Sequence, residues 1–501
     1  MYDNVPLSRP LATAQRLGDL APDRHRFQDK PVLLTGEHDV LSTANGVECF
    51  LDSLRLLVRI TSRLTVSLPI AFDGLQSECR RLSEAITFGN GAVVIDSAPD
   101  FGQHAAILSV GSRARNDLPW TVINSNGWLA RVSSGTVDLA RNCAQTNPIS
   151  SLAAASLGVT EVFKRLIRLK ESRGRLLDGM VFSLETYRCG ENAPGTPLPE
   201  RLQADVLLAG AGAIGNGIAH LLARLPFGGH AWVVDAQCYQ PENLGTCLLI
   251  GPSDIGTPKA DFAAHVLGER LKALGFQEKI ARFRQRLGSE VPYPTIVLNG
   301  LDNPEARQEI QSMWPDVIID GAIGDFPCQV SRHRWGDDAA CLACLFRQVG
   351  GEAAEQVQAR ATGLSVSRVR QFDDRVTDED VLDAPPEKQG WLRGHVGQQI
   401  CSVVREGVVR EVSDEPQHDG FEPSVPFVAC MSASMVVAEA VKFLAGWRTA
   451  LDTRFQFDLL RGPGFGEMFP QERRSDCDCV CRATNIEKWR RSRIVTGRLK
   501  P

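Results

Sequence analysis

A glycine-rich loop directly after an apolar segment is the feature that most constrains how this chain folds. The apolar segment covers residues 206–209, and the loop reads Gly-Ala-Gly-Ala-Ile-Gly over residues 210–215. Gly210 allows a sharp turn off a strand, Gly212 allows the backbone to approach a phosphate, and Gly215 allows the next helix to pack close to the sheet. The pattern predicts an α/β fold that binds a nucleotide at a helix N-terminus. Taken alone, it also fits a Rossmann oxidoreductase.

Charged residues after the loop favour ATP over a nicotinamide cofactor. Asp235 lies 20 residues after Gly215, where a carboxylate can accept the ribose hydroxyls. Lys259 and Asp302 follow it, and ATP needs both a cation at its phosphates and a carboxylate for Mg²⁺. Asp302 comes directly after a predicted strand at 295–300, at the edge of an open α/β sheet where ligands bind. Hydride transfer needs neither residue, so their order favours adenylation.

The ordered motifs of residues 200–482 resemble the adenylation domain of the ThiF/MoeB/ubiquitin-activating superfamily. Besides the glycine loop, they are Asn243-Leu244, Ile-Gly-Thr-Pro-Lys at 255–259, Leu-Asp-Asn at 301–303 with Arg307, Cys341-x-x-Cys344 and the helix ending at Lys442. The resemblance implies that Asp235 and Asn243 hold the ribose side of ATP, that Lys259 contacts its phosphates and that Asp302 binds Mg²⁺. In one departure, Thr246-Cys247 replaces the Arg-Gln of the family. The phosphate-contacting arginine must therefore come from elsewhere.

The first 190 residues repeat parts of the second domain. Val32–Gly36 parallels Val206–Gly210 at an offset of 174 residues, and Pro148–Lys164 parallels Pro426–Lys442 at an offset of 278. Glu37 and His38 replace the interior of the glycine loop, which puts a carboxylate where a phosphate would sit.

We therefore predict two Rossmann-like α/β adenylation domains, a degenerate one at 1–190 and an active one at 200–482, paired as a built-in pseudo-dimer. The resemblance supports the repeat, because members of the superfamily work as dimers or fused pairs of this fold. It also implies that an arginine of the first half can reach the active site, with Arg9 and Arg16 as candidates.

The second copy carries about 104 extra residues, much of them between Cys344 and Pro426. Residues 352–370 of this segment are predicted to form a helix, and residues 396–404 form an apolar run. In ubiquitin-activating relatives the catalytic cysteine lies in such an insert or crossover segment, here 345–425. Cys401 is therefore the candidate nucleophile for a thioester, as thiolates attack acyl groups readily near neutral pH.

Other readings of the cysteines remain open. A free cysteine is most often a small buried hydrophobe, which is the alternative role for Cys401. Cys430 is the rival nucleophile, although it opens an apolar helix, and Cys247 and Cys328 are less favoured.

Several other cysteines have the spacing of a zinc site. Cys341 and Cys344 would supply one half, and the other half would come from Cys477, Cys479 and Cys481, beyond a predicted strand at 454–458. Four thiolates close a tetrahedral structural site, so one late cysteine is spare and the sequence does not say which. A redox dithiol is disfavoured because no thioredoxin-like pattern surrounds the pairs. Residues 483–501 are predicted to be a solvated basic tail.

Composition argues against several classes of protein. A net charge of −5 gives no basic footprint for nucleic acid. No apolar run approaching a membrane span of about 18 residues is expected, and the polar N-terminus has no signal-peptide core. The 14 cysteines, partly in Cys-x-x-Cys and Cys-x-Cys pairs, suit a reducing cytosol. We therefore predict a cytoplasmic protein without nucleic-acid or membrane partners.

The resemblance implies activation of a ubiquitin-like protein. The carrier would be adenylated with MgATP, captured as a thioester on Cys401 and passed to a conjugating enzyme, as in the bacterial ubiquitin-activating-type enzymes of antiviral defence operons. The alternative is adenylation of a sulfur-carrier protein, as in thiamine or molybdopterin pathways. The fused degenerate half and the long insert argue against it. A nucleotide-binding scaffold and an NAD enzyme are disfavoured by the intact loop and by Lys259 with Asp302.

Overall fold

The computed structural model describes residues 10, 14, 27–69, 72–89, 91–301, 303–324, 326–346, 354–371, 374–400, 402–404, 406–407 and 425–496. The chain forms two compact units. The larger unit comprises Met1–Pro10, Asp19–Phe346 and Ser424–Pro501, and the smaller one comprises Leu11–Gly18 and Arg347–Pro423.

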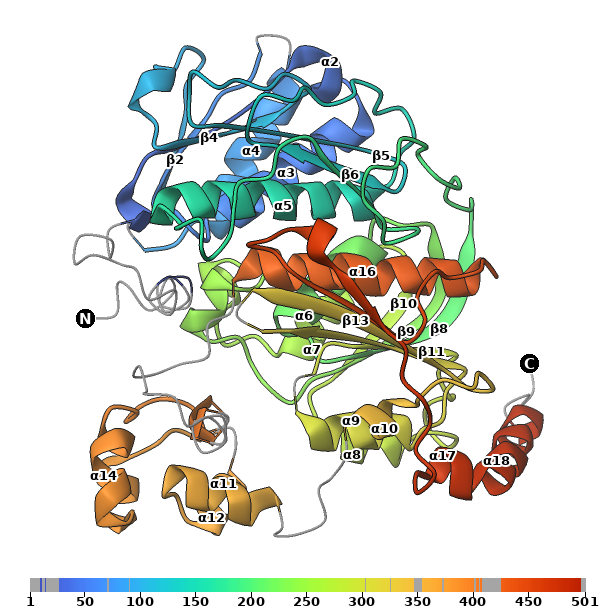
Figure 1. The fold of residues 1–501 in the computed structure, drawn as a ribbon. Helices are drawn as coiled ribbons and strands as arrows, with labels where there is room; N and C mark the ends of the chain where they lie inside the picture. The colour runs from blue at the N-terminus through green and yellow to red at the C-terminus, as the bar shows by residue number, and fades with distance from the viewer. Residues whose placement is uncertain are drawn as a thin grey trace. The chain divides into compact units, whose positions relative to one another are not determined.

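The first sheet of the larger unit has seven strands in the order β3-β2-β1-β4-β5-β6-β7 (Figure 1). The neighbours from β3 to β5 are parallel, and β6 and β7 continue the sheet in antiparallel pairs. The strands are β1 (Val32–Gly36), β2 (Arg63–Val66), β3 (Ala92–Ile95), β4 (Ala106–Val110), β5 (Trp120–Asn126), β6 (Leu129–Ser133) and β7 (Met180–Ser183). The helices are α2 (His38–Leu41), α3 (Ala44–Leu57), α4 (Asp73–Ile86), η3 (Phe101–Gln103) and α5 (Pro148–Ile167).

The second sheet repeats the first strand for strand. Its order is β10-β9-β8-β11-β12-β13-β14-β15, with the same parallel and antiparallel pairs at each equivalent position and β15 added at the end. The strands are β8 (Leu202–Ala209), β9 (Phe227–Val234), β10 (Lys272–Phe276), β11 (Ile296–Asn299), β12 (Val317–Ile323), β13 (Pro327–Arg334), β14 (Arg454–Asp458) and β15 (Glu467–Phe469). The predicted pair of Rossmann-like domains is confirmed.

Helices and short turns connect these strands and continue beyond them. They are α6 (Ala213–Leu222), η4 (Pro241–Gly245), η5 (Pro252–Asp254), α7 (Lys259–Leu267), α8 (Ile280–Arg284), α9 (Pro304–Gln311), α10 (Leu342–Leu345), α16 (Pro426–Leu444), η6 (Pro463–Phe465), α17 (Asp478–Cys481) and α18 (Ala483–Thr496).

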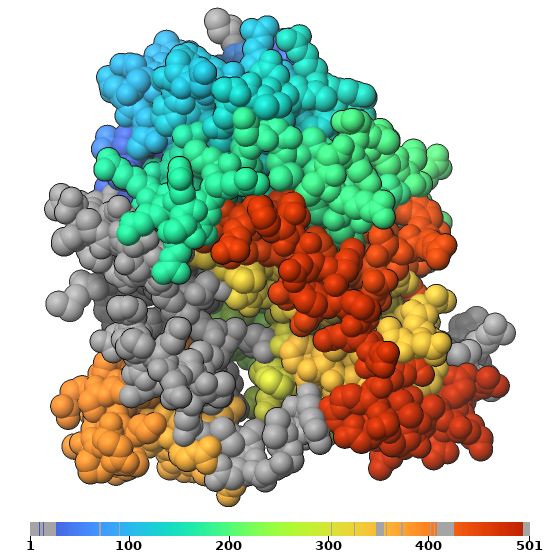
Figure 2. All heavy atoms as spheres, in the orientation of Figure 1, coloured from blue at the N-terminus to red at the C-terminus, as the bar shows by residue number. Residues whose placement is uncertain are grey.

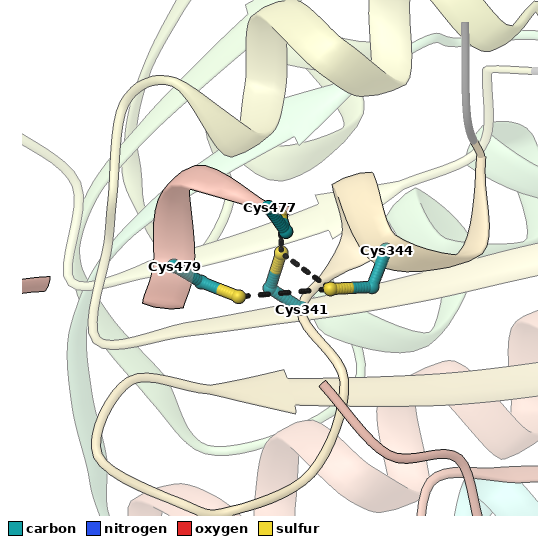
Figure 3. Close-up of side chains that lie close together, drawn as sticks. All are labelled: Cys341, Cys344, Cys477 and Cys479. Carbon is teal, nitrogen blue, oxygen red and sulfur yellow. Dashed lines mark hydrogen bonds between the residues drawn. The ribbon is translucent and has the colours of Figure 1, made fainter. Parts of the chain in front are cut away.

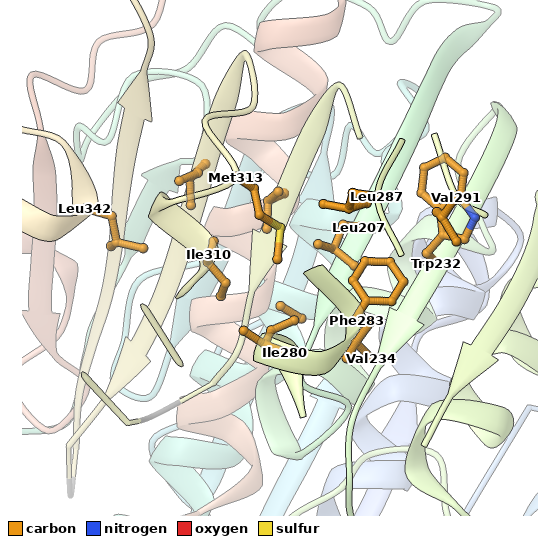
Figure 4. Packing of buried hydrophobic residues seen from close by; sticks show 13 residues of the cluster. Leu207, Trp232, Val234, Ile280, Phe283, Leu287, Val291, Ile310, Met313 and Leu342 are labelled. Carbon is orange, nitrogen blue, oxygen red and sulfur yellow. The ribbon is translucent and has the colours of Figure 1, made fainter. Parts of the chain in front are cut away.

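One face of the second sheet is covered by α8 and α9. Alternate residues of the strands, such as Leu207 and Trp232, point to this face because side chains alternate along a strand. They pack against Phe283 of α8 and Ile310 of α9 in one buried cluster (Figure 4). This core fixes the ends of the strands from which the glycine loop and its neighbours emerge.

The two halves of the larger unit meet along α5 and α16, which lie side by side (Figure 1). Nearly every residue of both helices is buried. Each helix nevertheless carries a buried ion pair three residues apart, Glu161–Lys164 at 2.5 Å and Glu439–Lys442 at 2.8 Å. Buried charges are tolerated when they are paired and hydrogen-bonded.

The pair in α16 is also bonded to the first half. The hydroxyl of Tyr187 donates to one carboxylate oxygen of Glu439 at 2.8 Å, and Thr449 donates to the other at 2.8 Å. Burial raises the pKa of Glu439, but Lys442, Arg332 and the hydrogen bond from Tyr187 together outweigh it and the net shift is downward. Glu439 is therefore held as a carboxylate that bridges the two halves.

The C-terminal segment adds a second area of contact. Figure 2 shows this orange-red segment lying against the teal and green part of the first half. Trp447 contacts Trp128, with ring centroids 6.1 Å apart, and Phe455 of β14 stacks on Phe182 of β7 at 6.1 Å. Equivalent strands of the two sheets therefore touch each other.

The expectation that no apolar run approaches membrane-spanning length is wrong for α16. This 19-residue helix has a window of mean hydropathy 1.7, which is long and apolar enough to cross a membrane by composition. However, 89% of that window is buried inside the protein, against α5, α6, β12 and β13. Its hydrophobicity is explained by its place at the centre of the fold.

The smaller unit has its own hydrophobic core. Its described helices are α11 (Ala354–Thr362), α12 (Val366–Val369), α13 (Asp378–Asp383) and α14 (Pro386–Arg393). The single helix predicted over 352–370 is wrong, because Gly363 takes a positive φ of 84° and Ser365 caps a new helix. The core contains Leu364, Val369 and Ile400 among others. Cys401 lies outside the described residues.

We expect loss of the buried cation in α16 to destabilise the larger unit strongly. Lys442→Met leaves the buried Glu439 with only the more distant Arg332, at 3.8 Å, as an ion-pair partner, and breaking a buried pair costs about 3–5 kcal/mol. The exposed Arg81–Glu78 pair of α4 is the control, since Arg81→Met should change stability by less than about 1 kcal/mol. Urea unfolding followed by tryptophan fluorescence measures both variants, and equal midpoints would contradict the assignment.

Candidate nucleotide and zinc sites

The glycine loop joins β8 to α6, and each of its three glycines has a different structural role. Gly210 has a φ of 85°, which favours glycine. A Cβ on Gly215, in the first turn of α6, would lie 1.9 Å from the carbonyl oxygen of Gly210, so this close approach requires glycine. A Cβ on Gly212 would meet no atom within 4 Å. Gly212 therefore faces open space at the N-terminus of α6, which is suited to a phosphate.

Asp235 follows β9 and lies beside this loop. Its carboxylate accepts the N–H of Ala211 at 2.8 Å and the N–H of Gln237 at 2.9 Å, and the residue is 8% exposed. The side chain thus ties the glycine loop to the end of the neighbouring strand. This is the edge of the sheet where a ribose acceptor was predicted.

Lys259 begins α7 and is joined to the same segment. Its ammonium donates to Oε1 of Gln237 at 2.8 Å and lies 5.9 Å from the ring centroid of Tyr239. The hydroxyl of Tyr239 donates to the carbonyl of Ala211 at 3.1 Å. Residues 235–239 therefore link the predicted phosphate-contacting lysine to the glycine loop.

Asn243 lies in η4, where its Oδ1 accepts the N–H of Gln240 at 2.9 Å. Asp302 lies outside the described residues, but the residues before it abut the glycine loop. A Cβ on Gly300 would be 3.1 Å from the nitrogen of Gly215, and a Cβ on Gly210 would be 2.9 Å from a methyl of Leu301. Binding of ATP and Mg²⁺ by these residues stays a prediction.

Asp320 is a buried residue of this region that the sequence analysis missed. It accepts from Nε of Arg307 at 3.0 Å and from the amide of Asn299, and Asn299 in turn accepts the N–H of Leu301 at 3.1 Å. Asp320 therefore holds both sides of the segment that contains position 302. The signal for it in the sequence was an aspartate inside the apolar segment 317–323.

The first half has the same strand order as the second half, but residues of different charge stand where the second half has its candidate ATP-binding residues. Two positions show this: Ser67 follows β2, whereas Asp235 follows β9, and Asp73 begins α4, whereas Lys259 begins α7. Glu37 occupies the loop after β1, where its carboxylate accepts the N–H of Arg113 at 2.8 Å and the hydroxyl of Ser112 at 2.9 Å. An acidic side chain fills this loop.

Four cysteines form a compact cluster between α10 and α17 (Figure 3). The Sγ–Sγ distances are 3.7 Å for Cys341–Cys344, 3.6 Å for Cys341–Cys477 and 3.6 Å for Cys344–Cys479. A tetrahedral ZnS₄ site with bonds of about 2.3 Å has sulfur–sulfur edges of about 3.8 Å. The donor set and its spacing therefore fit structural zinc.

Cys481 is the spare cysteine that the sequence left open. Its side chain is exposed, and its thiol donates to the carbonyl of Ser475 at 3.1 Å, outside the four-cysteine cluster. Since α17 holds Cys479 and follows Cys477, zinc at this site would fasten the C-terminal end to the segment before the insert.

The described candidates for the thioester nucleophile are core residues. Cys430, Cys247 and Cys328 are all fully buried. Burial raises the pKa of Cys430 and of Cys328 well above the ordinary value, which leaves little thiolate. Cys401, Arg9 and Arg16 lie outside the described residues, and their roles stay predictions.

Comparisons with known proteins place the chain in a family. The ThiF family matches residues 198–479, more than half of the sequence, and the chain belongs to this family. It is similar to the uncharacterized protein y4jF of Sinorhizobium fredii, with 26% identity over 495 residues that cover 94% of this chain and 92% of that protein.

Among solved structures, the comparison finds MccB of Escherichia coli with MccA-N7isoASN. The identity is 14% and the TM-score 0.36, over 55% of this chain and 67% of that one. MccB alone gives 13% identity and a TM-score of 0.35, over 55% and 65%. Membership of the ThiF family supports an adenylating enzyme that uses ATP.

The two glycines of the loop should separate folding from nucleotide binding. Gly215→Ala forces a Cβ onto the carbonyl of Gly210, and we expect a loss of about 1–3 kcal/mol in stability. Gly212→Ala has room in the protein, so its melting temperature should be unchanged while its Kd for ATP rises about tenfold or more. Calorimetry measures both quantities, and unchanged ATP affinity in Gly212→Ala would exclude close approach of the backbone to phosphate.

We expect one zinc ion per chain, held by the four clustered cysteines. Serine substitution of Cys344 or Cys479 should remove the metal and loosen the C-terminal segment, because serine is a poor zinc ligand. Cys481→Ser is the matched control and should keep its zinc. Elemental analysis after gel filtration measures the content, and a loss of zinc in the control would show that the ligand set is wrong.

Proposed function

We propose that this chain activates the C-terminus of a ubiquitin-like carrier protein. In the first step the carboxylate of the carrier attacks the α-phosphorus of ATP, forming an acyl-adenylate and releasing pyrophosphate. In the second step the thiolate of Cys401 attacks the acyl carbon, forming a thioester and releasing AMP. A conjugating enzyme then receives the carrier on its own thiol, which frees Cys401.

The first step is supported chiefly by the open loop at Gly212, with Asp235 and Lys259 bonded into the same segment. The N-terminus of α6 would face the phosphates, and Lys259 would exchange its bond to Gln237 for a phosphate oxygen. Asp302 would hold Mg²⁺, which offsets the charge of the leaving pyrophosphate. The contribution of the protein to this step is orientation and neutralisation of charge.

The second step is supported by the position of Cys401 in the sequence. It belongs to the smaller unit, between the cysteine pair and α16, where the resemblance puts the catalytic cysteine. Its neighbours Ile400 and Val403 are buried in the core of that unit. The buried thiols of Cys430 and Cys328 are poor rivals because burial raises their pKa.

A sulfur-carrier substrate would use the same first step and differ only in the acceptor of the acyl group. A role in antiviral defence follows only from the resemblance, and a cytoplasmic location follows from the cysteine pattern; both are part of this proposal.

Pyrophosphate exchange and thioester capture test the two steps separately. With MgATP and a panel of ubiquitin-like proteins ending in glycine, we expect exchange and a DTT-sensitive adduct on a non-reducing gel. Cys401→Ala should keep the exchange and lose the adduct, whereas Cys189→Ala, a partly exposed cysteine of the first half, should keep both. Lys259→Ala should lower exchange by about 100-fold or more, as loss of a preorganised charge contact does.

Each failure has a distinct meaning. Exchange without any adduct would favour the sulfur-carrier alternative. An adduct that survives in Cys401→Ala would place the thioester on another cysteine, and absence of exchange with every carrier would refute the proposal.

A further inference from the structure

One arginine of the first half, Arg59, contacts the loop of the second half that contains Asn243. Arg59 follows α3 and is fully buried. Its Nη1 donates to the carbonyl of Leu244, and its Nη2 donates to the carbonyls of Leu248 at 2.8 Å and Ile250 at 2.9 Å. One side chain of the first half is thus hydrogen-bonded to three carbonyl oxygens of the second half.

Burying this charge is unfavourable unless the surroundings compensate for it. Within the part of the chain that the structure describes, no carboxylate forms an ion pair with Arg59, so the carbonyl dipoles are its main partners. Burial lowers the pKa of Arg59 to about 10, and the group stays charged at neutral pH. The loop must therefore keep these oxygens turned toward the first half.

The end of α4 supports the same loop. A Cβ on Gly251 would lie 1.8 Å from the carbonyl oxygen of Ala85, so the backbones of the two halves are in direct contact. Phe88 packs into a buried cluster with Tyr239, Leu244 and other residues of this region. Contacts with the first half are therefore made at both ends of the segment 243–251, at Leu244 and at Leu248, Ile250 and Gly251.

Hydrogen bonds continue from this loop to the glycine loop. The N–H of Leu249 donates to Oδ1 of Asn216 at 2.7 Å, and the amide of Asn216 donates to the hydroxyl of Tyr239 at 3.0 Å. Tyr239 donates to the carbonyl of Ala211 at 3.1 Å. A displacement of the loop would thus be transmitted to the backbone that faces the phosphates.

We propose that Arg59 is a positioning residue for the nucleotide site, and that the first half acts as a built-in activating subunit. By holding residues 243–251, it keeps Asn243 and the glycine loop in the arrangement that binds ATP. This inference rests on the proposed function, which assigns the loop to ATP.

Direct binding of MgATP, measured by calorimetry without any carrier, tests the proposal. Arg59→Met should raise the Kd by about tenfold or more, and Arg59→Lys should lie between it and the wild type, because an ammonium cannot reach all three carbonyls in the same geometry. The control is Arg55→Met, a buried arginine one turn earlier that pairs with Asp52 of its own helix at 3.6 Å. It should lower the melting temperature while leaving the Kd within about twofold of the wild-type value.

A pair of glycine variants tests the same contact if Arg59→Met does not fold. Gly251→Ala has an allowed backbone conformation (φ −121°, ψ −179°), but its Cβ would displace the carbonyl of Ala85. Gly74→Ala, on an exposed and open position of α4, is its control. We expect weaker ATP binding in the first variant and wild-type binding in the second.

The outcomes separate this inference from the proposed function. If the wild type binds no MgATP, both are overturned. If the wild type binds MgATP and Arg59→Met and Gly251→Ala bind it equally well, the inference alone is overturned and the adenylation proposal stands.

Discussion

The packing of α5 against α16 is the constraint on which the rest of the larger unit depends. Both helices are buried nearly all round, so each needs the other half of the chain to cover it. Separating the halves would expose this apolar surface. It would also break the hydrogen bond from Tyr187 of the first half to the buried Glu439 of the second. α16 packs in addition against α6, whose first turn faces the candidate nucleotide site. The packing of α16 therefore both holds the two halves together and positions α6 at the candidate nucleotide site.

Much of this architecture could be predicted because its signals are local. Glycine spacing, apolar strands ending in a charged residue and cysteine pairs each reflect neighbours in the sequence, and the repeated helix with Glu161 and Glu439 revealed the duplication. Contacts between distant segments leave no such pattern. Nothing near Arg59 in the sequence predicts carbonyl partners some 190 residues later, and the exclusion of Cys481 depends on how α17 is turned. The break at Gly363 was missed because a helical composition outweighed one glycine.

The two halves show how a fold can be kept while its chemistry is exchanged. The strand order agrees, but Ser67 and Asp73 of the first half stand after β2 and at the start of α4, where the second half has Asp235 after β9 and Lys259 at the start of α7. Selection for packing and selection for binding act on different atoms, since the sheets depend on apolar interiors and the site depends on loop residues. The first half accordingly has the same strand order and a matching buried helix, but different residues in its loops.

Glu37 makes the difference between the two loops independent of any ligand, because its carboxylate is part of the chain. Its carboxylate is covalently attached beside the N–H of Arg113 and the hydroxyl of Ser112, so its effective concentration there far exceeds that of any free anion in solution. The first half behaves as though an intramolecular ligand were always bound. We therefore expect ATP to bind only in the second half of the chain. Binding curves for this protein should therefore show no cooperativity between halves, unlike those of a dimer with two working sites.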